Sequence, residues 1–254
     1  MWIANVASNT VTKLRASDGA LQGTYTVGQQ PYGVAFDGAN IWVANHASND
    51  LTKLRGSDGS LLGTFPLGVG PAGVIFDGAN IWVVNHGNDN VVKVQVSDGS
   101  IVGTFAVGHG PKFIAFDGAN VWVTNEQTNN VTKLRVSDGT VQGTFAVGNA
   151  PEGLAFDGTA IWVANKDDDT VSKLKASDGT VLGTFTVGHE PYGVGFDGVS
   201  IWIANEESNT VSKLLAKTGA LLGTFNVGLA PYAIAFDGAN IWVANTLSNN
   251  VSKL

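Results

Sequence analysis

The sequence contains no cysteine, so both a disulfide framework and a thiolate metal site are excluded. Basic residues are scarce as well: 14 Lys and Arg stand against 21 Asp and Glu, which gives a formal net charge of −7. Because nucleic-acid binding depends on clustered Lys and Arg, this balance argues against a nucleic-acid partner.

Long apolar runs are also absent. The longest span about six residues, whereas a helix that crosses a membrane needs about 20. The opening segment "MWIANVASNT" has no basic stretch followed by an apolar one, so we predict no signal peptide. We therefore expect a soluble chain without a membrane partner, and the sequence indicates no particular compartment. With 44% hydrophobic residues it is able to bury a large core.

What the sequence does contain is one unit repeated many times. A Gly-Thr step recurs every 40 residues without insertion or deletion, at Gly23, Gly63, Gly103, Gly143, Gly183 and Gly223. The segment "IWVAN" at 41–45 keeps the same phase and occurs in seven versions, which hold all seven tryptophans.

Each repeat reads as four short strands rich in β-branched and aromatic residues. In the repeat that begins at Gly33 these are strand A (33–38), strand B (41–45), strand C (51–55) and strand D (61–68). Asp-Gly turns at 37–38 and 58–59 have hairpin spacing, so neighbouring strands are predicted to be antiparallel.

Strand B indicates how the repeats assemble. In Ile41-Trp42-Val43-Ala44 both alternating faces are apolar, so the strand must be covered on two sides. A ring of four-stranded sheets provides this cover, because each sheet lies between two others. We therefore predict an all-β fold, a β-propeller with blades of 40 residues; a β-solenoid is the alternative.

The number of blades depends on the two ends. The chain opens in strand B and stops in strand C, so strands A and D occur six times and strands B and C seven times. We predict one domain over 1–254 with seven blade positions, the first lacking strand A and the last strand D. The alternative is a six-bladed ring with a surplus hairpin. We expect a monomer closed at this seam or, failing that, an oligomer joined there, because unpaired edges recruit other strands.

The unit resembles known propeller repeats. Trp122-Val123-Thr124-Asn125 and the Pro-x-Gly at 31–33 resemble the YVTN-type repeat, and more distantly the NHL repeat and the repeats of streptogramin (virginiamycin) B lyases. The lyase resemblance implies a magnesium-dependent elimination that uses His and Glu. The blade motif of those lyases ends in Thr-Glu where this chain has Ala-Asn, and their catalytic motif finds no residue-by-residue match here.

The repeats are so alike that they indicate either recent copying of one unit or an engineered, symmetrised sequence. Function is then expected where the copies differ: in the loop between strands B and C (the BC loop), in the link from strand D to the next strand A (the DA link), and just after the Pro. In a meander these positions share one edge, where loops carry function. The candidate binding residues are His46, His86, His109, Lys112, Glu126, Glu152, Lys166, His189, Glu190 and Glu206.

Two functions follow from this reading. The first is a non-catalytic scaffold that binds a ligand or a protein partner, with no catalytic residues and no cofactor. The alternative is a divalent-metal-dependent lyase or hydrolase that uses His86, His109 and Glu126, since these residues come from adjacent blades. Mg²⁺ or Ca²⁺ is the alternative to no cofactor. The lyase resemblance implies Mg²⁺, and "KDDDT" at 166–170 offers oxygen ligands for Ca²⁺. That segment lacks the Gly and distal Glu of a calcium loop, so a solvated acidic loop is favoured there.

Asparagine ends every strand B, and Ser-Asn often follows it, as in Asn45, Ser48 and Asn49. We predict that these side chains bond to nearby backbone within the turn.

Overall fold

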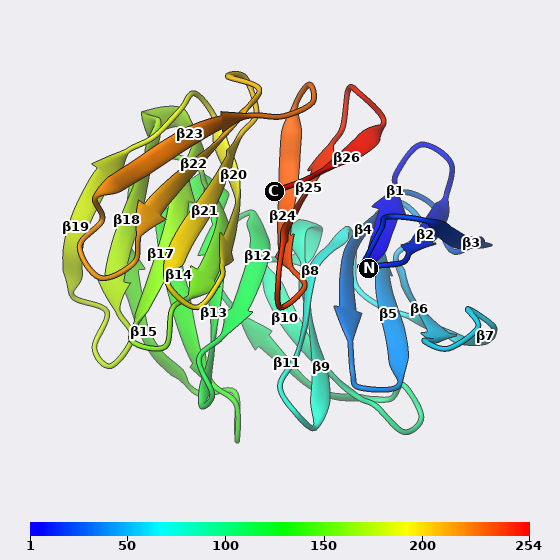
Figure 1. Ribbon diagram of the computed structural model, residues 1–254. Coiled ribbons are helices and arrows are strands. Elements are labelled where there is room, and N and C mark those ends of the chain that lie inside the picture. The colour runs from blue at the N-terminus through cyan, green and yellow to red at the C-terminus, as the bar shows by residue number, and fades with distance from the viewer. The chain divides into compact units, whose positions relative to one another are not determined.

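The computed structural model describes all 254 residues and contains seven antiparallel sheets in chain order (Figure 1). Five sheets have four strands, whereas the first and the last have three. The chain is an all-β, seven-bladed propeller, as predicted, and the six-bladed alternative with a surplus hairpin is wrong. The first blade lacks strand A and the last lacks strand D, which confirms the predicted phase.

The inner two strands of the repeat occupy equivalent ranges in every blade. Strand A is β4 (Pro31–Phe36), β8 (Pro71–Phe76), β12 (Pro111–Phe116), β16 (Pro151–Phe156), β20 (Pro191–Phe196) and β24 (Pro231–Phe236). Strand B is β1 (Trp2–Asn5), β5 (Asn40–Asn45), β9 (Asn80–Asn85), β13 (Asn120–Asn125), β17 (Ala160–Asn165), β21 (Ser200–Asn205) and β25 (Ile241–Asn245).

The other two strands complete each sheet. Strand C is β2 (Thr10–Leu14), β6 (Asp50–Arg55), β10 (Asn90–Gln95), β14 (Asn130–Arg135), β18 (Thr170–Lys175), β22 (Thr210–Leu215) and β26 (Asn250–Lys253). Strand D is β3 (Leu21–Thr26), β7 (Leu61–Pro66), β11 (Ile101–Ala106), β15 (Val141–Ala146), β19 (Val181–Thr186) and β23 (Leu221–Asn226).

Three BC loops contain a single turn of 3₁₀-helix: η1 (His86–Asn88), η2 (Glu126–Thr128) and η3 (Lys166–Asp168). No helix of the structure is long and apolar enough to span a membrane.

The chain forms two compact units, which we describe separately. Unit 1 comprises residues 1–123 and 134–142, and unit 2 comprises residues 124–133 and 143–254. The division passes through the sheet of β12 to β15. The single domain over 1–254 and the closure of the ring at the seam stay predictions.

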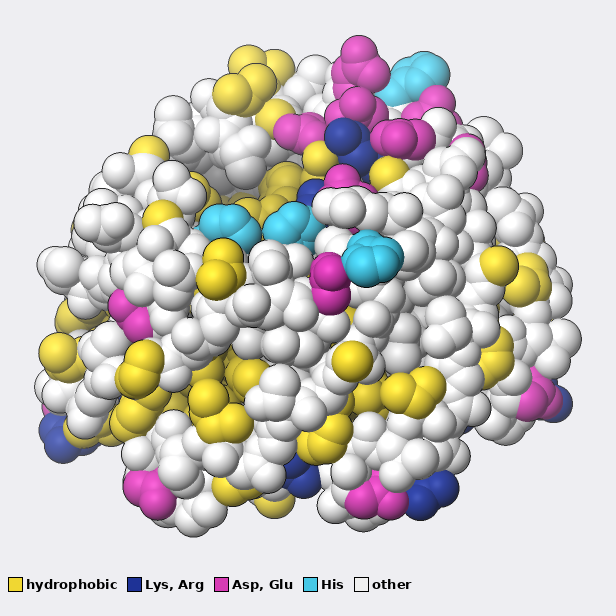
Figure 2. Space-filling view, turned by 180° about the vertical axis from the view of Figure 1, so that it is seen from behind, with side chains coloured by type: hydrophobic (Ala, Val, Ile, Leu, Met, Phe, Trp, Pro, Cys, Tyr) yellow, Lys and Arg dark blue, Asp and Glu magenta, His cyan; other side chains and the backbone are white.

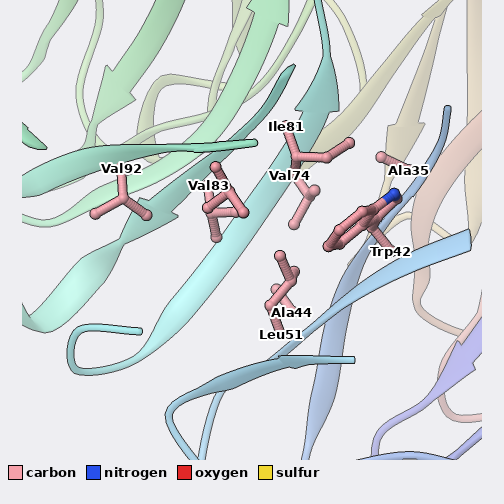
Figure 3. Close-up of a cluster of buried hydrophobic side chains, with 9 residues drawn as sticks. Ala35, Trp42, Ala44, Leu51, Val74, Ile81, Val83 and Val92 are labelled. Atoms are coloured by element: carbon pink, nitrogen blue, oxygen red, sulfur yellow. The ribbon is translucent and has the colours of Figure 1, made fainter. Parts of the chain in front are cut away.

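Strand B is buried on both faces, as its sequence predicts. In β5, Trp42 and Ala44 pack with Ile81 of the following blade (Figure 3). The alternate residues Ile41 and Val43 belong to the cluster shared with the preceding blade. Complete burial of such a side chain contributes roughly 1.5–3 kcal/mol. In this way β5 holds the sheets before and after its own together.

The tryptophan of strand B also organises polar groups around it. In blade five, Trp162 donates its Nε1–H to Asp157 Oδ2 at 2.8 Å and packs on Phe185 with ring centroids 5.4 Å apart. Burial would raise the pKa of Asp157, but hydrogen bonds from Trp162 and from two backbone amides outweigh it and hold this pKa below its ordinary value. Asp157 is thus a charged acceptor for the indole.

A lysine then joins this blade to the next. Lys173 pairs with Trp162 in the register of β17 and β18, and its Nζ lies 4.9 Å from the centroid of the indole ring. The same Nζ donates to the backbone oxygen of Ala216 in blade six at 2.6 Å. Lys13, Lys53, Lys93 and Lys133 make the equivalent bond 43 residues ahead. The nearly buried amine of Lys173 thus has a hydrogen-bond acceptor in the turn between strands C and D of the next blade.

Strand D is an edge strand with a bulge. Where β6 pairs with β7, Lys53 lies opposite Gly63 and Leu54 opposite Leu61, so Leu62 has no partner and is 42% exposed. The same shift occurs between strands C and D in blades one, three, five and six.

We predict that Trp162→Ala lowers the free energy of unfolding by about 3–5 kcal/mol, because the side chain is fully buried between sheets. Urea unfolding measures this loss. The control Leu182→Ala, on exposed β19, should change stability by less than about 0.5 kcal/mol. Equal losses in the two variants would contradict the buried position of strand B.

We also predict that Lys173→Met destabilises the chain by about 1–3 kcal/mol, because it leaves the Ala216 oxygen without its donor while keeping an apolar stem on Trp162. Lys175 is the matched control on the same strand, since it forms an exposed pair with Asp178. Lys175→Met should cost less than about 1 kcal/mol. The link between blades is refuted if the two losses agree.

Candidate functional site

The BC loops and the DA links lie at the same edge of each sheet, as predicted. The first residue of a BC loop donates its backbone N–H to the last residue of the DA link that enters the same blade. His46 N lies 2.9 Å from Gln30 O and Glu206 N lies 2.9 Å from Glu190 O, and His86, Lys166 and Thr246 repeat the contact. We call this the variable edge. Histidine side chains are visible at the surface in Figure 2.

A left-handed residue in each of the first six BC loops fastens the loop to the next blade. Asn49 has φ 59° and its Oδ1 accepts the backbone N–H of Gly70 at 2.9 Å. Asn9, Asp89, Asn129, Asp169 and Asn209 do the same 21 residues ahead. Ser48 accepts the amide of Gln29 in the link that enters its own blade. The prediction that Ser48 and Asn49 bond within their own turn is wrong, because Ser48 reaches the link before β4 and Asn49 reaches the link before β8.

The asparagine that ends strand B also differs from its prediction. Asn165 is fully buried and donates to the hydroxyls of Thr170 and Ser172 on strand C at 3.0 and 2.9 Å. Its Oδ1 accepts the amide of Gly148 at 3.0 Å. The residue ties two strands and a link together instead of closing a local turn.

Two of the candidate histidines pair with aspartate. His109 Nδ1 lies 2.7 Å from Asp89 Oδ2, and His189 Nδ1 lies 2.8 Å from Asp169 Oδ2. Only these two BC loops have Asp instead of Asn at the left-handed position. Only these two also have His 20 residues later, in the following DA link. The bond from His109, followed by that from the Gly110 amide, holds the pKa of Asp89 below its ordinary value.

In unit 1 four rings follow one another at the variable edge. The ring centroids of Phe113 and Tyr32 are 6.2 Å apart, those of Tyr32 and His46 are 6.0 Å apart, and those of His46 and His86 are 6.2 Å apart. All four side chains are half-buried. We call this group the ring cluster. Lys112, another candidate residue, precedes Phe113 on β12 and is also half-buried.

In unit 2 the variable edge carries a different group. Lys166 Nζ lies 5.4 Å from the Tyr192 ring centroid and 3.9 Å from Glu190 Oε1. Burial would lower the pKa of Lys166, but Tyr192, Glu190 and Asp167 raise it overall, so the amine stays protonated. Burial, followed by the charge of Glu152, raises the pKa of Tyr192.

Close approach of the strands A brings two tyrosines of unit 2 together. A side chain at Gly193 would collide with the backbone oxygen of Tyr232, so glycine is required there. The rings of Tyr192 and Tyr232 consequently lie 4.6 Å apart, and burial raises the pKa of Tyr232. Glu152, the equivalent residue of β16, is fully buried.

Glu126 lies in an open polar pocket of unit 2, lined by Glu126, Gln127, Asn129, Asn149, Ala150 and Asp167. The adjacent Asp168 accepts two hydrogen bonds from Asn149, at 2.7 and 2.8 Å. Asp168 of the 166–170 segment is thus engaged by the link before β16, and Asp169 by the link before β20.

The residues do not fit the divalent ion that the lyase resemblance implies. His86 directs Nδ1 to the Pro111 oxygen at 3.1 Å, and His109 is engaged with Asp89. No group of three or more His, Asp or Glu side chains is arranged to hold a metal ion. His86 and His109 therefore do not form a metal site in this structure.

Comparison with known proteins identifies the fold alone. No protein-family model matches the chain, and no curated protein matches it. Hydrazine synthase from Kuenenia stuttgartiensis superposes with a TM-score of 0.90 at 18% identity, covering 100% of this chain and 91% of that one. A streptogramin B lyase gives 0.86 at 18% identity, covering 99% and 88%.

Virginiamycin B lyase from Staphylococcus aureus gives a TM-score of 0.85 at 19% identity, covering 99% of this chain and 89% of that one. The expected likeness in fold to the streptogramin B lyases is therefore confirmed. The chain shares its propeller fold with proteins of different activities.

We predict that His109→Asn lowers the free energy of unfolding by less than about 1 kcal/mol. Adding Asp89→Asn should restore most of this loss. The double variant then has the same pair of residues as Asn129 and Asn149, which bond at 2.9 Å. Thermal unfolding of the two single variants and the double variant gives the coupling energy.

The coupling between Asp89 and His109 should depend on pH. The pKa of Asp89 is lower in the folded state, so its stabilisation is complete above the unfolded value of about 3.9 and disappears as the pH falls through the folded value. We expect the coupling measured at about pH 5 to decline toward about pH 2. A coupling that is constant over this range would show that Asp89 carries no charge in the pair.

Proposed function

We propose that the protein is a non-catalytic propeller whose variable edge binds a ligand or a protein partner. One observation carries the proposal. The repeats differ mainly at the variable edge, and there the BC loop is joined to the DA link by hydrogen bonds between backbone groups. A bond from His46 N to Gln30 O is indifferent to the side chains on either residue. The hydrogen bond itself therefore places no demand on the side chain of His46, although Gln30 occupies a left-handed position with φ 51°.

The opposite edge differs in this respect. There the Asp157 carboxylate receives Trp162 Nε1–H, and Lys173 reaches Ala216 through its side chain, so residue identity is constrained by the structure. Variation at one edge and constancy at the other is the pattern expected when a rigid scaffold presents loops for recognition.

The candidate residues form two chemically distinct groups within this edge. Unit 1 presents the ring cluster, which is aromatic and rich in imidazole. Unit 2 presents a protonated Lys166 among Glu190 and two neutral tyrosines. Such mixtures of aromatic surface and a few polar groups are typical of binding sites.

The test is a thermal-unfolding screen against a panel of defined nucleobases, sugars, amino acids and peptides, since a compound bound only by the folded state raises the midpoint. Three variants accompany the parent chain: alanine at His46, His86 and His109; alanine at Lys166, Glu190 and Glu206; and a control with alanine at the exposed Arg55 and Arg135 of the opposite edge.

We expect a compound that stabilises the parent and the control but loses its effect in one of the two edge variants. Compounds that stabilise all four chains equally would place binding elsewhere and refute the proposal.

The second candidate is a lyase or hydrolase, for which the only support is the likeness in fold to streptogramin B and virginiamycin B lyases, since His86, His109 and Glu126 form no metal site. Its test is incubation with a streptogramin B, with and without Mg²⁺, followed by chromatography and fragment mass spectrometry, because elimination within the ring leaves the mass unchanged whereas hydrolysis adds one water. Conversion that is abolished by His86→Ala would replace the scaffold proposal with catalysis.

A further inference from the structure

We propose that the ring cluster of unit 1 binds a planar, uncharged molecule whose edge carries an N–H group beside a C=O group, as in a lactam or a nucleobase. In this proposal His46 donates a hydrogen bond and His86 accepts one. The inference rests on the proposed function and specifies its ligand class at this part of the variable edge.

His86 has one tautomer that satisfies its surroundings. Its Nδ1 lies 3.1 Å from the backbone oxygen of Pro111. A carbonyl oxygen only accepts, so Nδ1 must carry the proton, and in the neutral ring Nε2 then carries a lone pair. Nε2 makes no hydrogen bond within the chain and is not fully buried. His86 therefore offers an accessible acceptor.

His46 offers the opposite group. Its Nδ1 is buried without a hydrogen-bond partner, and the Nδ1–Cε1 side of the ring faces Gly70. Nδ1 lacks a partner in either tautomer, but a buried N–H without an acceptor is less tolerated than a buried lone pair without a donor, and a proton on Nε2 is able to reach water or a ligand. The Nε2–H tautomer is thus favoured, and His46 offers a donor.

This complementary pair selects among ligand classes. Two accessible donors would suit an anion, and two accessible lone pairs would suit a metal ion. One donor and one acceptor, on rings 6.2 Å apart, suit an uncharged edge that has both groups. The half-buried faces of Tyr32 and Phe113 continue the cluster and supply the aromatic surface on which a flat ring packs.

Uracil is a suitable probe, and dimethyluracil, in which both ring N–H groups are methylated, is its matched control. We expect calorimetry to show that uracil binds the parent chain and that dimethyluracil binds at least about tenfold more weakly. His46→Phe and His86→Phe keep a ring but remove the donor or the acceptor, and each should weaken uracil binding by about tenfold. His189→Phe, in unit 2 and exposed, should leave binding unchanged.

Nitrogen NMR of histidine-labelled protein reads the two tautomers directly and independently of any ligand. The proposal fails if His46 and His86 have the same tautomer, or if Ni²⁺ binds at the pair while uracil does not. If the tautomers are as assigned but uracil and dimethyluracil bind equally or not at all, the ligand class is wrong. The proposed function survives that result when another compound of the panel still depends on the edge variants.

Discussion

The burial of a single strand from both sides is the constraint on which this structure depends. Trp42 and Ile41 are neighbours in sequence, yet they pack against different blades, because side chains of a strand alternate. A sheet whose second strand is apolar on both faces is not stable by itself. Each blade therefore requires a neighbour on either side, and the propeller is the arrangement that supplies it.

The polar contacts follow from that packing. Once Trp162 is enclosed, its indole N–H needs an acceptor, which Asp157 provides, and Lys173 lies over the ring with its amine against the next turn. One edge of each sheet thereby acquires side chains that the fold cannot spare. The variable edge is joined by main-chain hydrogen bonds and by a left-handed Asn or Asp of the BC loop, so it depends less on the side chains that differ between repeats.

Much of the fold is readable in the sequence because its signals are local. The alternation at 41–44 predicts a doubly buried strand, and the observed β5 (Asn40–Asn45) begins one residue before the predicted range. Asp-Gly turns predict the hairpins, and the phase of the ends predicts the three-stranded first and last sheets. Each of these features depends on residues within one period.

The contacts of the variable edge are less predictable from the sequence, because their hydrogen bonds join residues of different repeats. Asn49 looks like turn chemistry, but its partner is Gly70 in the following link. The pairing of His109 with Asp89 has a signal that comparison of the repeats reveals: Asp stands at 89 and 169, where other repeats have Asn, and His follows 20 residues later in both cases. Reading His109 by itself as a partner of His86 overlooks that correlation. The tautomers of His46 and His86 depend on burial and on Pro111, which no motif records.

The lysine bonds that join the blades have a consequence for how the chain folds. Each spans 43 or 44 residues, about one period, and each connects a strand C only to the turn of the next repeat. These bonds close loops of one repeated, moderate length. We therefore expect folding to propagate from blade to blade, because neighbouring repeats supply each other's contacts.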